Sequence, residues 1–345
     1  MKYLNYLLLA IPLSIYLELT HANEAAIFIV SLLSIVPLAA ILGKATEELS
    51  VHTGPRAGGL INATLGNAAE LIITILALKE GLLTVVKASI AGSILGNILL
   101  VLGFSALIGG LKHKRLRFNE NVSNLNTSLL LMIVTALSVP AIFSFTGHIS
   151  ANHLQTLSLF TAIGLIMIYI VSLVFSFKTH RHLFHVEHKA QTPEWSLGKS
   201  IVIMFLVVVA IVAMSEILVT SLRPATSIMG LSELFVGLVL VPIVGNAAEH
   251  STAVLMALKN KMNIALEIAV GSSVQIALFV APVLVFISYF LSHPMNLLFG
   301  LLEILSILLA IVVVNNLVRD SETDYLEGLI LIVTYSLLSA GFYLL

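Results

Sequence analysis

The chain has 345 residues, of which 59% are hydrophobic and 10% are charged, and its formal net charge is −1. Soluble domains carry about 25% charged residues, so this chain lacks the polar surface that soluble domains of its length need. The absence of cysteine excludes structural disulfides and thiolate metal or redox sites. We therefore expect an all-α integral membrane protein, because the apolar runs are too long for barrel strands and lack their alternation.

The first apolar run follows a short basic start and resembles a signal peptide. It lacks a small-x-small cleavage site before Glu24, so we expect an uncleaved first helix. A membrane span needs roughly 20 apolar residues to cross about 30 Å of hydrocarbon. On this measure the sequence predicts eleven spans, over residues 4–20, 25–43, 57–79, 84–111, 124–147, 153–177, 197–221, 231–258, 263–291, 296–318 and 326–344.

The distribution of basic residues agrees with eleven spans and a cytoplasmic N-terminus. With this topology, fourteen basic residues lie in loops on the cytoplasmic side, where the positive-inside rule expects them. The other side keeps three, namely Lys79, Lys87 and Arg223. The fourteen are Lys2, Lys44, Arg56, Lys112, Lys114, Arg115, Arg117, Lys178, Arg181, Lys189, Lys199, Lys259, Lys261 and Arg319.

A six-residue motif occurs twice, as Gly66-Asn67-Ala68-Ala69-Glu70-Leu71 and, 179 positions later, as Gly245-Asn246-Ala247-Ala248-Glu249-His250. Gly92-Ser93 and Gly271-Ser272 keep the same spacing. An odd number of spans per repeat gives the repeats opposite orientations, an arrangement typical of transporters whose site lies near the membrane midplane. We expect a first helix in residues 1–22, five-helix repeats in 23–178 and 196–345, and a cytoplasmic linker in 179–195. Recurring small residues also serve helix packing, but packing does not require the recurring Asn and Glu.

Each motif places one carboxylate in an apolar helix. Glu70 is the only charged residue between Ala57 and Leu78, and Glu249 the only one between Leu234 and Leu258. Helix rise places both near the middle of the bilayer, where an ionisable residue indicates a functional site. Gly66 and Gly245 should weaken their helices, and Pro242 should leave a carbonyl near Leu238 without its helical partner.

Two carboxylates match the charge of one divalent cation. Calcium takes six to eight oxygen ligands from carboxylate, carbonyl, amide and hydroxyl groups. The repeat helices offer such groups in Asn67, Asn246, Ser93, Ser272, Ser273 and Gln275. The absence of cysteine disfavours zinc or copper. Without a cation, two close carboxylates in a low dielectric would repel, so protons are the expected counter-load.

The two motifs and their flanks, including Ser232-Glu233-Leu234-Phe235-Val236-Gly237, resemble the calcium/proton exchangers of the calcium/cation antiporter superfamily. The resemblance implies that Glu70 and Glu249 bind calcium and protons alternately. It also implies that Asn67, Asn246, Ser93, Ser272 and Gln275 complete the site, with Gly66 and Gly245 beside them. Sodium/calcium exchangers of the superfamily have Thr-Ser where this chain has Asn-Ala, which disfavours sodium coupling. The acidic helix that some members carry between the halves is missing, because the linker from Lys178 to Pro193 has one acid, Glu187.

The linker also contains four histidines, His180, His182, His185 and His188. They could form a metal or pH sensor, or one histidine box of a membrane metalloenzyme, but a solvated basic loop is the favoured interpretation. Glu18, Glu216 and Glu303 are expected to reach the membrane interface, with a gating role left open for Glu216. The acidic loop that contains Asp320, Glu322, Asp324 and Glu327 is interpreted as a solvated turn.

We therefore expect an antiporter, not an enzyme, that exports Ca²⁺ from the cytoplasm in exchange for H⁺ through the cell (inner) membrane. The expected partners are Ca²⁺, H⁺ and lipid, with no nucleic acid and no cofactor, and a homo-oligomer is left open. A sodium-coupled exchanger, a cation channel using the same site and a metalloenzyme built on the histidines are the alternatives.

Overall fold

The computed structural model describes residues 4–147, 149–180, 193–291 and 293–345. The chain up to the linker forms η1 (Leu4–Leu9), α1 (Ala10–Leu19), α2 (Glu24–Leu65), α3 (Ala68–Lys79), α4 (Leu83–Leu95), the π-helical turn η2 (Gly96–Val101), α5 (Leu102–His113), β1 (Leu116–Arg117), α6 (Glu120–Phe145), α7 (Ala151–Val174) and the π-helical turn η3 (Phe175–Thr179).

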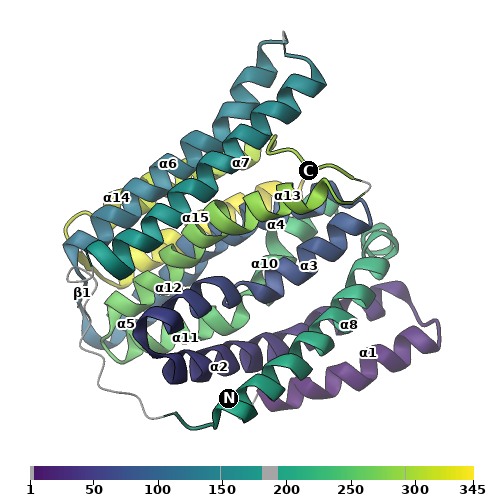
Figure 1. The fold of residues 1–345 in the computed structure, drawn as a ribbon, viewed down its shortest axis with the longest axis horizontal. Coiled ribbons are helices and arrows are strands. Elements are labelled where there is room, and N and C mark those ends of the chain that lie inside the picture. The colour runs from purple at the N-terminus through teal and green to yellow at the C-terminus, as the bar shows by residue number, and fades with distance from the viewer. Residues whose placement is uncertain (1–3, 148, 181–192, 292) are drawn as a thin grey trace.

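The rest of the chain forms α8 (Leu197–Met229), α9 (Glu233–Phe235), the π-helical turn η5 (Val236–Leu240), α10 (Val241–Gly245), α11 (Ala247–Leu258), α12 (Met262–Gln275), the π-helical turn η6 (Ile276–Val280), α13 (Ala281–Ser288), α14 (Leu301–Leu317), β2 (Glu322–Thr323) and α15 (Tyr325–Tyr343). Helices α1, α2 and α8 pack together along one edge of the bundle, and α6 and α7 lie at the opposite edge (Figure 1).

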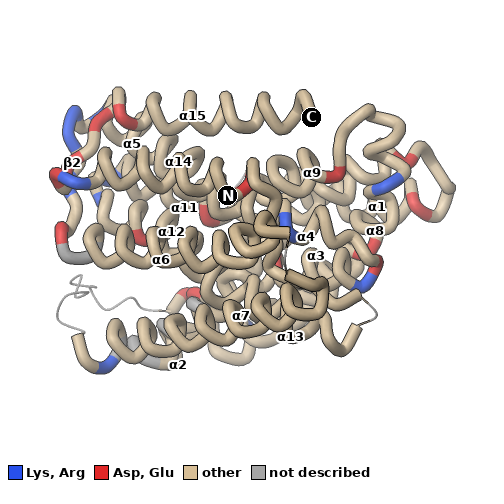
Figure 2. The backbone as a smooth tube through the Cα atoms, turned by 90° about the horizontal axis from the view of Figure 1, so that it is seen from above, with Lys and Arg blue, Asp and Glu red and all other residues tan. Residues whose placement is uncertain are grey.

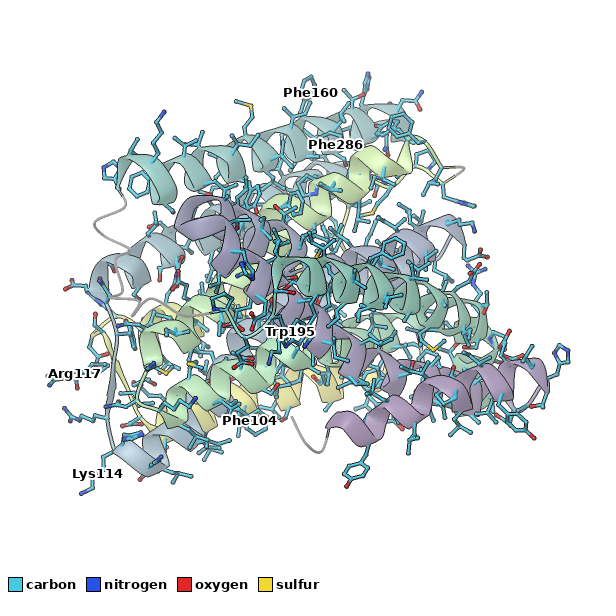
Figure 3. All side chains as sticks on the ribbon, turned by 60° about the horizontal axis from the view of Figure 1, so that its bottom comes forward. Phe104, Lys114, Arg117, Phe160, Trp195 and Phe286 are labelled. Atoms are coloured by element: carbon cyan, nitrogen blue, oxygen red, sulfur yellow. The ribbon has the colours of Figure 1, made fainter. Side chains whose placement is uncertain are left out.

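The bundle has two polar ends and an apolar middle. Most Lys, Arg, Asp and Glu residues gather at the two ends (Figure 2). Large apolar side chains such as Phe160 and Phe104 are exposed on the helices between them (Figure 3). One end contains the short antiparallel pair β1–β2, in which Arg117 pairs with Glu322, and we call it the β face. The other end contains the turns at residues 80–82, 230–232 and 293–300, and we call it the opposite face.

Within the described part of the chain, seven helices are long and apolar enough to cross a membrane, or eight if the bent pair Glu233–Gly245 and Ala247–Leu258 forms one span. Two shorter apolar helices cover Tyr6–Leu19 and Leu301–Leu317. The chain is thus a helical membrane protein, while the number of eleven spans stays a prediction.

Several predicted boundaries are wrong. The second helix does not stop at residue 43 but continues to Leu65, across a kink at Gly54, whose φ of 81° is unfavourable for other residues. The predicted span 57–79 is interrupted between Leu65 and Ala68. The predicted span 296–318 begins only at Leu301, because backbone groups of Met295 and Leu298 form hydrogen bonds with side chains of α4, α7 and α13 instead of with their own helix. The turn predicted between Gly147 and Asn152 is confirmed by the gap between α6 and α7.

The linker predictions fall mostly outside the described residues, because His182, His185 and His188 belong to 181–192. His180 is described, and its ring stacks on Phe175 with centroids 3.9 Å apart. Glu303, expected at the interface, is instead 6% exposed.

Candidate functional site

Both repeated motifs interrupt a helix at their asparagine. Asn67 has φ −95° and ψ 20°, and Asn246 has φ −94° and ψ 7°, so neither residue is helical. The second interruption bends the chain by 59°. Glu70 and Glu249 therefore lie in the first turns of α3 and α11, where the partial positive charge of a helix N-terminus favours a carboxylate.

The motif glycines have a different role from the predicted one. Gly66 keeps helical angles, with φ −56° and ψ −40°, so the helix is broken one residue later than expected. A Cβ on Gly245 would lie 3.4 Å from Glu70 Oε1, and one on Gly66 would lie 3.8 Å from Glu249 Oε1. Each glycine thus faces the carboxylate of the other motif, and a Cβ at either position would only touch that carboxylate at van der Waals distance.

The two carboxylates differ in their surroundings. Glu70 is buried, whereas Glu249 is partly exposed, and the two interact electrostatically. Glu249 Oε2 accepts a hydrogen bond of 2.6 Å from the Ser272 hydroxyl. Glu70 Oε2 is buried and has no hydrogen-bond donor among the described residues. Glu70 thus presents an oxygen that the protein leaves free.

The two motif amides present oxygens in the same way. Asn67 Nδ2 donates to Gln275 Oε1 at 2.6 Å, and Asn246 Nδ2 donates to Ser93 Oγ at 3.3 Å and to the Pro242 carbonyl at 3.0 Å. The Oδ1 atoms of both asparagines are buried and accept no hydrogen bond from the described residues. Because each NH₂ group is occupied, the amide orientation leaves both oxygens available.

Most of the predicted site residues are therefore brought together, with two exceptions. Ser273 donates to the Ala269 carbonyl in its own helix. The Leu238 carbonyl packs against Gly92. Among the described residues, no cluster of three or more His, Cys, Asp or Glu side chains could hold a metal ion. A cation bound here would need the two carboxylates together with neutral amide and hydroxyl oxygens, which is the ligand mixture that calcium accepts.

A polar pair beside the site was not predicted. Asn97, on η2, is buried, and its Oδ1 lies 3.2 Å from His250 Nε2. Asn97 and Ser93 are four residues apart, as are His250 and Asn246, so the pair adds a second contact between the same helices. The repeat places Ile276 and Leu71 at the corresponding positions. Polar residues in one half against apolar residues in the other were the sequence signal for this pair.

Comparisons with known proteins identify the family of the chain. The model of the sodium/calcium exchanger protein family matches residues 23–178 and 199–344. A Ca²⁺/H⁺ antiporter of Aphanothece halophytica is 43% identical, over 98% of this chain and 95% of that protein. The Ca²⁺/H⁺ antiporter ChaA of Bacillus subtilis is 44% identical, over 97% of each chain.

Solved structures give the same relationship. The structure of native YfkE matches with a TM-score of 0.88 and 40% identity, over 99% of this chain and 100% of that chain. The H⁺/Ca²⁺ exchanger CAX shares the fold at 18% identity, with a TM-score of 0.76, over 99% of this chain and 92% of that one. The resemblance to calcium/proton exchangers is thereby confirmed, and the chain belongs to the sodium/calcium exchanger protein family.

Proposed function

We propose that this protein is a secondary active antiporter that exports Ca²⁺ from the cytoplasm in exchange for H⁺. One observation carries the proposal: Glu70 Oε2, Asn67 Oδ1 and Asn246 Oδ1 are buried acceptors that the described residues leave without donors. An unsatisfied buried oxygen costs about 1–3 kcal/mol, more for a charged group, and a bound cation removes that cost. The names of the relatives from Aphanothece halophytica and Bacillus subtilis support the same pair of transported ions.

Proton coupling follows from the two carboxylates. Calcium neutralises both charges when it binds to Glu70 and Glu249. After it leaves, the two carboxyl groups remain close, in a site of low dielectric, and proton binding removes their repulsion. The site is then filled in either case, and the two loads exclude each other because they use the same oxygens.

The topology of the antiporter belongs to the same proposal. We place the N-terminus and the β face in the cytoplasm and the protein in a prokaryotic-type inner membrane. Residues 1–22 form a separate helix, 23–178 and 196–345 form inverted repeats, and 179–195 link them. Loops at 112–117 and 259–261 supply the basic residues that the positive-inside rule requires on that side.

Purified protein in calcium-free vesicles, with a calcium dye inside and a pH dye outside, tests the function. An imposed pH gradient should drive calcium uphill without sodium, and a calcium gradient should drive protons in the opposite direction. Calcium flux that follows a sodium gradient and ignores pH would replace proton coupling by sodium coupling. Flux that only runs downhill would make the protein a channel.

Glu70→Gln and Glu249→Gln should each reduce calcium-driven proton flux by at least a hundredfold while the protein stays folded. Each change removes half of the countercharge and one proton carrier. Glu80→Gln is the matched control, since Glu80 is an exposed acid at the other end of α3. Normal flux in either site variant would exclude the alternating carboxylates. A loss of all activity after replacement of the four linker histidines would favour the metalloenzyme alternative.

A further inference from the structure

Lys87 ties helix α4 to the segment before α14. Its Nζ donates to Asn296 Oδ1 at 2.6 Å and to the Leu298 carbonyl at 2.9 Å. Lys87 is only partly exposed, although it is the kind of residue expected to extend into solvent. Two neutral oxygens therefore hold an ammonium group inside the opposite face of the bundle.

Glu303 is the acidic residue of the same region, and we call Lys87, Asn296 and Glu303 the cluster. Its Oε2 accepts a hydrogen bond of 2.6 Å from the Gly300 backbone N–H, and its Oε1 is buried without a donor among the described residues. Glu303 forms no ion pair within 4 Å with a described residue, and the charge of Lys87 in α4 acts on it only at longer range. Burial of a carboxylate costs less when an opposite charge lies in the same region of low dielectric.

The cluster exists in only one half of the repeat. The residue 179 positions after Lys87 is Leu266, which is buried and apolar, and the residue 179 positions before Glu303 is Asn124, which is exposed. Gln275, the partner of Asn67, belongs to the site, but neither Lys87 nor Glu303 contacts a residue of either motif in any of the hydrogen bonds above. The cluster is therefore an addition to the transport site and lies on one face of the protein.

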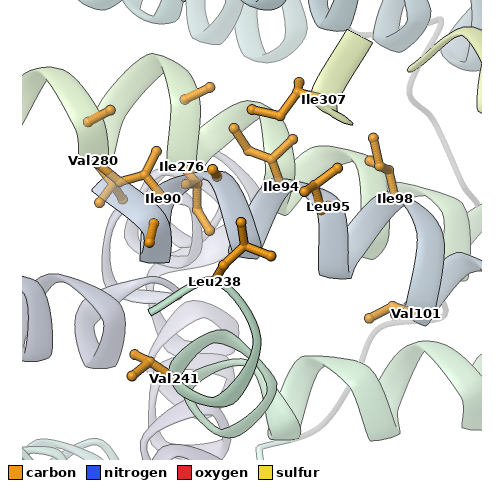
Figure 4. Packing of buried hydrophobic residues seen from close by; sticks show 14 of the residues in the cluster. Ile90, Ile94, Leu95, Ile98, Val101, Leu238, Val241, Ile276, Val280 and Ile307 are labelled. Carbon is orange, nitrogen blue, oxygen red and sulfur yellow. The ribbon is translucent and has the colours of Figure 1, made fainter. Parts of the chain in front are cut away.

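Helix α4 lies between this cluster and η5, the turn that precedes the second motif. Ile307 of α14 lies beside Ile94 on one side of α4, and Leu238 lies on the other side (Figure 4). The contact with η5 uses Val85, Ala88 and Gly92, which share one face of α4 because they are spaced by three and four residues. Lys87 lies on another face of the helix, so the cluster contacts α4 on a side that does not face η5.

We propose that Lys87 and Glu303 are positioning residues that hold α4 against residues 296–303 and thereby keep the ion site closed toward the opposite face. Only the expected effect on calcium transport rests on the proposed antiport function; the role in holding α4 does not. Without the cluster, α4 is free to move away from η5, and the conformation open to the opposite face gains population. A shift of this kind strengthens calcium binding from one side and weakens it from the other.

Lys87→Met and Glu303→Gln, each reconstituted in vesicles, test the transport consequence. The KM for calcium should rise about three- to tenfold on the β face and fall on the opposite face. Lys87→Arg should restore the original ratio, since it keeps the charge and the donors. Lys79→Met is the control, because Lys79 is an exposed lysine at the same end of the bundle. Equal changes of KM on both faces, or none, would overturn the positioning role.

A second measurement needs no calcium transport. Val239→Cys in this cysteine-free chain reports the closed contact, because Val239 of η5 is 7% exposed. An impermeant maleimide should label it several-fold faster when Lys87→Met or Glu303→Gln is added. Unchanged labelling overturns the proposal even if the protein transports calcium, and faster labelling supports it even if the protein does not. If a single variant fails to fold, Lys87→Leu with Glu303→Gln removes both charges together and uses the leucine of the other repeat.

Discussion

The two helix crossings beside the motifs differ, although one repeated sequence builds both. On the opposite face, a Cβ added to Gly92 would overlap the Leu238 carbonyl, and one added to Gly237 would lie 2.8 Å from Val85 O and from Ala88 Cβ. On the β face, α12 barely contacts α2, and a Cβ on Gly271 would meet no described atom within 4 Å. One crossing is closed by backbone contact and the other is open.

Exposure at matched positions shows the same difference. Leu60 is 50% exposed, whereas its counterpart Val239 is 7% exposed, and Asn62 is exposed whereas Val241 is 3% exposed. After the kink at Gly54, the second part of α2 contacts the first part, since the Ser50 hydroxyl donates to the Gly58 carbonyl at 2.6 Å. Glu249, next to the open crossing, is partly exposed. The comparison shows that one repeated sequence forms two conformations of the same crossing; under the proposed antiport function, an exchange of the two conformations would move the opening to the other face.

Among the tests of this comparison, the largest expected effect comes from the matched glycines. Gly92→Ala places a methyl group on backbone that cannot move aside, so we expect a loss of about 1–3 kcal/mol of stability and a lower melting temperature. Gly271→Ala should leave stability unchanged or raise it by up to about 1 kcal/mol, because alanine is the better helix former. Transport by Gly271→Ala should nevertheless fall more than tenfold if α12 must later form the close contact that α4 forms now.

Gly164→Ala is the control for this pair, since Gly164 lies in α7 and a Cβ there would also meet no described atom within 4 Å. It should keep both stability and transport. Melting curves in detergent and vesicle flux separate the two effects. Equal melting temperatures for the Gly92 and Gly271 variants would contradict the closed and open crossings.

A smaller effect is expected from single cysteines at the matched positions Leu60 and Val239. An impermeant maleimide should react with Leu60→Cys at least tenfold faster than with Val239→Cys, because only the first side chain is accessible. Saturating calcium should reduce the difference if a filled site allows the crossings to exchange. Labelling of both positions at the same rate, with or without calcium, would show that the asymmetry does not persist in the membrane.

The sequence predicted the parts of this site that both halves share. Glu70, Glu249, Asn67 and Asn246 recur at one spacing, and the structure places all four beside the two helix interruptions. Periodicity and charge were sufficient there, because a lone acid in an apolar helix has few structural explanations.

The differences between the halves could not be predicted in this way. A repeat predicts equal crossings, so the sequence contains no sign of which one is closed. Glu303 was expected at the interface because it is near a helix end. Its hydrogen bond with the Gly300 N–H is a local cap, but its burial comes from α14 packing against α4 and α6, which only the tertiary structure brings together. Asn97 and His250 were not predicted because they differ between the halves, whereas the prediction depends on residues that the halves share.

On the β face, the first part of α2 is held by contacts with residues 194 and 195, and we call these contacts the anchor. The anchor limits where the opening of this crossing can arise. Glu48, buried in α2, accepts hydrogen bonds from the backbone N–H groups of Glu194 and Trp195 at 2.9 and 3.0 Å. His52 Nε2 lies 2.7 Å from the Trp195 carbonyl, and Lys44 binds Glu194 at 2.6 Å. Trp195, labelled in Figure 3, is the only tryptophan of the chain. Because α2 is held here up to His52, the open crossing must come from the chain beyond Gly54.

The smallest expected effect is the acid titration of this anchor. The hydrogen bond from Lys44 lowers the pKa of Glu194 below its ordinary value, so the ion pair stabilises the anchor at neutral pH and is lost as pH falls through the lowered pKa. Trp195 fluorescence should therefore change only in acid, and the change should be small because Glu194 is exposed and solvent screens the pair. Glu194→Gln should remove this transition and leave transport at neutral pH intact, since Glu48 still holds the backbone. An unchanged transition in Glu194→Gln would show that the ion pair does not cause it, and a loss of transport would mean that the anchor depends on the ion pair after all.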